Sequence, residues 1–169
     1  KGKGGKVIET GPFYSMFDVG DYTFAPWKVV WREQASRMIA SLVGQEANKP
    51  VIPDHKLMLV NCDILEEAHY VCAMLNSNLS RFGVMAYAIG TQMDPHILEH
   101  IRIPKYDPAD PVNRALAEAS KEAHEAAARG DESRLREIER QVDAIAAKLW
   151  NLSDKELAEI QRSLAIVEG

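Results

Sequence analysis

This sequence contains little cysteine and no long apolar run. The 169 residues include two cysteines, Cys62 and Cys72, which are too few for a disulfide framework. No apolar run is long enough to cross a bilayer, and no apolar stretch follows the basic residues 1–6 as it would in a signal peptide. These absences argue against a disulfide-stabilised secreted domain and predict a cytoplasmic protein without a membrane partner.

The sequence also lacks the motifs of several enzyme classes. Residues 1–6 are rich in glycine and lysine, but they lack the preceding strand and the following Ser or Thr of a phosphate-binding loop. No Gly-x-Ser-x-Gly nucleophile elbow occurs, and neither cysteine has the spacing of a zinc site. We therefore predict that this chain supplies no catalytic residue, no metal ligand and no cofactor site of its own.

Charge is distributed unevenly along the chain. The formal net charge is −5, but residues 1–62 carry +2 and residues 107–169 carry −5. Binding to nucleic acid depends on a local basic face rather than on the overall balance. The N-terminal part is therefore the better candidate for a contact with nucleic acid.

Hydrophobic residues recur with two different periods, which predicts an α/β (α+β) fold. We expect a body in residues 1–106, with a small mixed twisted sheet and packed helices, and a helical tail in residues 107–169. Asp63 with Glu66, and Ser153 with Glu156, have the spacing of a capping box. The predicted strands are 27–32, 37–43, 51–52, 57–60 and 101–103, and the predicted helices are 64–76, 79–88, 112–128, 132–149 and 153–167.

The short stretch PDHK raises the alternative of a metal-dependent nuclease. Asp54 and Lys56 form a D-x-K pair that would share one face of a strand, with Glu33 or Glu46 as the second carboxylate. The proline before Asp54 would interrupt a central strand, which favours a turn that leads into the strand. In a turn, Lys56 can still contact a phosphate without any catalysis.

Five segments, in this order and spacing, resemble a known family. They are FYSMF at 13–17, YTFAPWKVVWR at 22–32, KPVIPDHK at 49–56, EEAHYVCAMLNS at 66–77 and IRIP at 101–104. Together they resemble the C-terminal specificity part of bacterial adenine-specific DNA methyltransferases of restriction or phage-defence systems. They are also similar to the target recognition domains of type I specificity subunits.

The resemblance implies a target recognition domain that docks on duplex DNA and reads bases. In that family a separate domain transfers the methyl group from S-adenosylmethionine and holds the flipped adenine with an (Asn/Asp)-Pro-Pro-(Tyr/Phe) motif. This chain has no such motif and no initiator Met, so we expect a non-catalytic piece of a longer DNA adenine methyltransferase. The helical tail is then expected to pack on itself or against the parent methyltransferase domain.

A cationic face of the first strand is the expected DNA surface. Lys28, Val30 and Arg32 would share one face, while Trp27, Val29 and Trp31 would face the core. The complete set of predicted DNA-binding residues is Lys28, Arg32, Arg37, Lys49, His55, Lys56, Thr91 and Gln92. Two alternatives stay open, namely a solvated sheet face without a ligand and a protein-interaction module that does not meet DNA.

Overall fold

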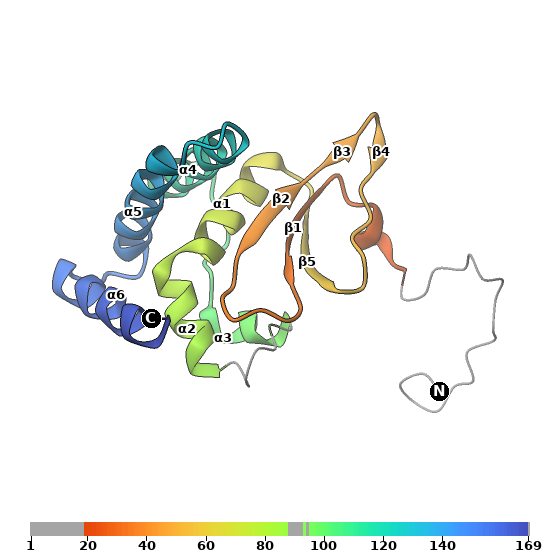
Figure 1. Cartoon of the computed structure of the whole chain (residues 1–169). Coiled ribbons are helices and arrows are strands. Elements are labelled where there is room, and N and C mark those ends of the chain that lie inside the picture. The colour runs from red at the N-terminus through yellow and green to blue at the C-terminus, as the bar shows by residue number, and fades with distance from the viewer. Residues whose placement is uncertain (1–18, 88–92, 94, 169) are drawn as a thin grey trace, which may run out of the picture.

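A three-stranded antiparallel sheet forms the centre of the N-terminal half (Figure 1). The computed structural model describes residues 19–87, 93 and 95–168. The strand order is β2-β1-β5, and neighbouring strands run antiparallel. The strands are β1 (Trp27–Arg32), β2 (Ala40–Val43) and β5 (Leu57–Cys62), with a separate hairpin of β3 (Gln45–Glu46) and β4 (Lys49–Pro50). The predicted α+β class is confirmed, although the described strands pair only antiparallel rather than in a mixed sheet.

One face of β1 lies in the core. Successive side chains of a strand point to opposite faces, and the apolar side chains Val29 and Trp31 share one of them. Val29 and Trp31 are 0% and 2% exposed, as the strand pattern predicts. Trp31 lies opposite Ala40 of β2 and Met58 of β5. Its indole Nε1–H donates a hydrogen bond of 2.7 Å to the carbonyl of Met93, which ties a distant part of the chain to the sheet.

Helices cover the sheet on the side away from the β3–β4 hairpin (Figure 1). They are α1 (Leu65–Asn76), α2 (Asn78–Tyr87), α3 (Leu98–Ile101), α4 (Pro111–Ala128), α5 (Glu132–Leu149) and α6 (Asp154–Glu168), with short 3-10 turns η1 (Asp21–Phe24) and η2 (Pro95–Ile97). Helix α1 packs against β1 and β2, α4 packs along α1, and α5 packs along α4. Helix α6 closes the arrangement by packing on α2 and α5.

Two apolar clusters meet at α1. Its residues Ala68, Cys72 and Leu75 belong to the cluster under the sheet. Its residues Tyr70, Ala73 and Met74 belong to the cluster among α4 and α5. Cys72 is the small core residue that the helical pattern suggests, and its burial raises the pKa of the thiol to about 12.

The C-terminal helices begin with side-chain caps that the sequence supplies locally. The Asp110 carboxylate accepts from Val112 N–H at 2.8 Å, and Pro111 occupies the first turn of α4. The predicted capping box at Ser153 is confirmed, since Glu156 Oε2 accepts from its backbone N–H at 2.8 Å. The turn between α4 and α5 needs Gly130, whose φ of +69° is costly for residues with a Cβ.

Four local predictions are wrong. Strand 101–103 does not form, because Ile101 ends α3 with its side chain buried and Arg102 adopts a φ of +51°. Residues 51–52 belong to no strand, and β2 begins at Ala40 rather than at residue 37. The capping box expected at Asp63 is replaced by an N-cap at Ile64 without a side-chain hydrogen bond.

Within the described part of the chain, no helix is long and apolar enough to span a membrane.

Candidate nucleic-acid interface

Lys28 is buried rather than exposed on the sheet. It is 1% exposed, and its Nζ donates a hydrogen bond of 2.7 Å to the carbonyl of Ala25. Burial lowers the pKa of its ammonium group. Val30 on the same face is 8% exposed, so the expectation of an open cationic sheet face is wrong. The physical reason is that the Lys28 side chain turns back onto the segment leading into β1, where the Ala25 carbonyl accepts its hydrogen bond, while η1 packs on the neighbouring strand β5.

Arg32 and Arg37 are both exposed, and the structure brings them together. They line one hollow of about 450 Å³ at the connection between β1 and β2, together with Ser36, Ile39 and Ser41. Neither arginine forms an ion pair with any residue of the described ranges. Their charges are therefore available to an anion.

The remaining predicted residues are spread out. Lys49 is exposed on β4, in the hairpin that projects from the sheet (Figure 1). His55 is exposed, with Nδ1 3.0 Å from Asp54 Oδ1. Lys56 is exposed, and its Nζ lies 3.6 Å from Glu33 Oε2. Thr91 and Gln92 lie outside the described residues.

The stretch PDHK forms the turn that the proline favours. Asp54 Oδ1 accepts from Lys56 N–H at 3.0 Å, and the Asp54 carbonyl accepts from Leu57 N–H at 2.9 Å. Asp54 therefore precedes β5 instead of lying within it. Across the described ranges, no group of three His, Cys, Asp or Glu side chains could hold a metal ion.

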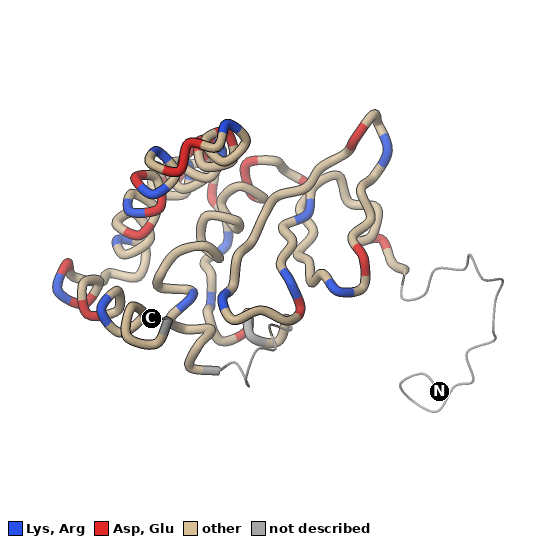
Figure 2. The backbone as a smooth tube through the Cα atoms, viewed as in Figure 1, with Lys and Arg blue, Asp and Glu red and all other residues tan. Residues whose placement is uncertain are grey.

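A second hollow, of about 260 Å³, adjoins the first and gathers four arginines from three parts of the chain. Arg37 comes from the β1–β2 connection, Arg81 from α2, and Arg136 and Arg140 from α5. We call this surface the arginine hollow. Glu139 and Asp143 also line it, so its lining side chains carry more positive than negative charge. Figure 2 shows basic and acidic positions interleaved along α4 and α5. For that reason the cluster of arginines is not evident from the sequence.

Asp143 links the elements that line the arginine hollow through its hydrogen bonds. This carboxylate is 4% exposed and accepts from the Asn78 backbone N–H at 2.7 Å and from Asn78 Nδ2 at 2.6 Å. Gln161 of α6 donates a third hydrogen bond at 3.1 Å. Burial raises the pKa of Asp143, whereas these hydrogen bonds favour the carboxylate form. Asp143 thereby fixes the first turn of α2 to α5 and α6.

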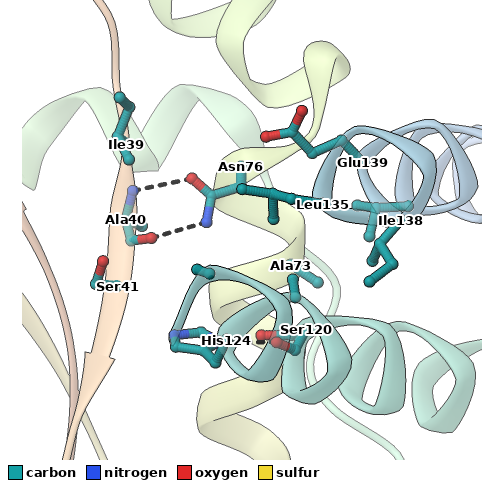
Figure 3. A pocket seen from close by; sticks show the side chains of 13 residues that line it. Ile39, Ala40, Ser41, Ala73, Asn76, Ser120, His124, Leu135, Ile138 and Glu139 are labelled. Carbon is teal, nitrogen blue, oxygen red and sulfur yellow. Dashed lines mark hydrogen bonds between the residues drawn. The ribbon is translucent and has the colours of Figure 1, made fainter. Parts of the chain in front are cut away.

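A mostly apolar cavity of about 180 Å³ lies beside the arginine hollow, between β2 and helices α1, α4 and α5 (Figure 3). Asn76 reaches across to the outer edge of β2, where Oδ1 accepts from Ala40 N–H at 2.9 Å and Nδ2 donates to the Ala40 carbonyl at 2.8 Å. His124 Nε2 accepts from Leu42 N–H at 3.1 Å. Two helix side chains thus satisfy backbone groups that an unpaired edge strand would leave open.

The sequence pattern alone does not identify Arg81, Arg136 and Arg140 as site residues. Arg136 and Arg140 pair with Glu132 and Glu137 of their own helix, which is the usual signature of a solvated helix face. Only the packing of α5 beside α2 and the β1–β2 connection brings these arginines next to Arg37.

Comparison with known proteins gives one partial similarity. No protein-family model matches the chain, and no solved structure matches it. A segment of 76 residues is 33% identical to the type II methyltransferase M.NspV of Nostoc sp.. The chain is therefore similar to part of a methyltransferase. The match covers 45% of this chain but 16% of the length of M.NspV, so the activity of a whole methyltransferase does not transfer to it directly.

Proposed function

We propose that this chain is a DNA target recognition domain of an adenine-specific (N6) DNA methyltransferase of a restriction or defence system. In this proposal it binds duplex DNA and positions a separate domain that uses S-adenosylmethionine. The single observation that carries the proposal is the joined pair of arginine-lined hollows in a chain similar to part of M.NspV. Arg37 and Ile39 line both hollows, so the cationic surface continues from β1 to α5.

The chemistry of this surface suits a polyanion that is held by its backbone. Guanidinium groups present several N–H donors in a planar fork that matches phosphate oxygens, and they stay charged at neutral pH. Arg32 and Arg37 have no acidic partner among the described side chains, so binding a phosphate would break no ion pair there. Ile39 is 58% exposed and lines the same hollow as these arginines, a position from which an apolar side chain can contact a base in a groove.

Binding to a labelled DNA duplex, followed by fluorescence anisotropy at several salt concentrations, tests the proposal. We expect binding that weakens steeply with salt, and a log–log slope that falls by about 0.9 for each phosphate contact removed in Arg32→Ala or Arg37→Ala. Arg134→Ala is the matched control, because Arg134 is an exposed arginine of α5 that pairs with Glu122 and does not line either hollow.

Selection from a random duplex library tests target recognition separately from general DNA affinity. A target recognition domain is expected to enrich one short sequence. Absence of duplex binding by the unmodified chain would refute the proposal and favour a protein-interaction module. Enrichment of no sequence, despite salt-dependent binding, would leave a DNA-binding domain without a recognition role.

A further inference from the structure

The arginine hollow differs from an ordinary solvated helix face in its architecture. Its four arginines come from the β1–β2 connection, α2 and α5, which are far apart in sequence. Exposed charges on one helix arise from local sequence, whereas a convergence of three elements is a product of the tertiary fold. This convergence points to one small anion rather than to general solubility.

Asp143 and Glu139, the two acids of the hollow, differ in how accessible their negative charges are to an incoming anion. Both carboxylate oxygens of Asp143 already accept hydrogen bonds from Asn78 and Gln161, and its side chain is nearly inaccessible. Glu139 is exposed and is the acid that an incoming anion would meet. Glu139 thus adds one accessible negative charge to a lining that contains four arginines.

The arginines are held to different degrees. Arg81 is half-buried, and its Nη1 donates to Asn78 Oδ1 at 2.9 Å, so it is fixed through the same residue that Asp143 anchors. Arg37 is exposed, without an ion pair in the described part of the chain. Arg136 and Arg140 form exposed ion pairs within α5. Pairs of this kind contribute little free energy, so these two guanidinium groups can turn toward a stronger anion.

We infer that the arginine hollow binds one phosphodiester group of a DNA backbone, with Arg37 and Arg140 on the same phosphate. This inference rests on the proposed function. Arg81 would supply a preset guanidinium, and Arg136 would complete the charge around the phosphate. The neighbouring hollow at Arg32 would then receive an adjacent part of the same strand, because the two hollows share Arg37 and Ile39.

A double-variant cycle tests whether one phosphate is shared. Arg37→Ala, Arg140→Ala and the double variant are compared with Arg134→Ala in anisotropy titrations of a DNA duplex over a range of chloride concentrations. We expect each single variant to weaken duplex binding, and the double variant to lower the log–log salt slope by no more than about 0.9, since at most one phosphate contact is lost. Arg134→Ala is expected to keep the slope of the unmodified chain.

The outcomes separate this inference from the proposed function. No duplex binding by the unmodified chain overturns both. Duplex binding with unchanged affinity in Arg37→Ala and Arg140→Ala overturns the phosphate site alone, and so does a slope that falls by about 1.8 in the double variant, since that fall means two separate phosphates. Side-chain NMR of the arginine Nε–H groups with inorganic phosphate distinguishes the source. Saturable shifts with inorganic phosphate that added duplex does not displace would assign the hollow to a free phosphate and overturn the backbone assignment.

Discussion

At the scale of single residues, the buried histidine His69 couples folding to pH. It is 8% exposed, its Nδ1 lies 3.2 Å from Ser120 Oγ, and its ring meets the ring of His124 edge-on at 5.4 Å between centroids. Burial, followed by the charges of His124 and Lys121, lowers the pKa of His69. The His69 ring therefore binds a proton more weakly in the folded chain than in the unfolded one.

The sign of the resulting pH dependence follows from that difference. The pKa of His69 in the folded chain lies below the unfolded value of about 6.5. Above that value the ring is neutral in both states, and the contribution of His69 to stability is fully present. As the pH falls from there through the folded pKa, the unfolded chain binds the proton more readily, and this contribution is lost. We expect the free energy of unfolding to fall between about pH 7.5 and about pH 5.5, and to fall less in His69→Gln. Urea titrations across this range measure the effect. His55→Gln is the control, because the side chain of His55 is 79% exposed, and an equal change in both variants would contradict the prediction.

At the scale of elements, the helices could be predicted largely from sequence, whereas the strand edges could not. Apolar residues at intervals of three and four specify a helix locally, so helices α1, α2, α4, α5 and α6 begin and end within two residues of expectation. Residues 101–103 have a strand-like pattern too short to decide between structures. The packing of α3 on α2 decides it, and that contact is not visible in the local sequence.

The edge strand β2 depends on a side chain from a helix. Ala40 is 4% exposed, and the Asn76 side chain pairs with both its N–H and its carbonyl. We expect Asn76→Ala to lower the free energy of unfolding by roughly 1–3 kcal/mol, because the Ala40 N–H loses its partner and the Ala40 carbonyl keeps only the weak thiol donor of Cys72. Denaturant titration measures this loss.

Two further variants sharpen the test of Asn76. Asn76→Asp keeps the size of the side chain but places a carboxylate oxygen against the Ala40 carbonyl, so we expect a loss of similar size. Asn61→Ala, at an exposed position of β5, is expected to change stability by no more than about 0.5 kcal/mol. If all three variants behave alike, the hydrogen bonds of Asn76 do not stabilise β2.

At the scale of the whole molecule, part of the candidate site could be predicted and part could not. Arg32 and Arg37 are named from sequence because they belong to predicted strands in the basic part of the chain. Lys28 is misassigned because strand alternation gives the face of a side chain but not what covers that face. Arg81 and Arg140 enter the site only through helix packing. A site built from several elements therefore becomes visible only when the fold is known.

The packing around α1 bears on whether residues 1–106 and 107–169 fold as separate units. Helix α1 contributes to both apolar clusters, and α4 packs along it over much of its length. Ile138 of α5 is 1% exposed in the cluster among α1, α4 and α5. We expect Ile138→Ala to cost about 2–5 kcal/mol, because it opens a cavity in a packed core.

Hydrogen exchange of individual amides shows whether that cost reaches the sheet. If both clusters unfold together, the opening free energy of the amides in β1 falls by the same amount as that of the amides in α5. A matched substitution at Ile166, which is 82% exposed near the end of α6, is expected to leave both values unchanged. Loss of protection confined to α4, α5 and α6 would show instead that the helical tail unfolds independently. In that case the arginine hollow, which needs α5 beside α2, would open without disturbing the sheet.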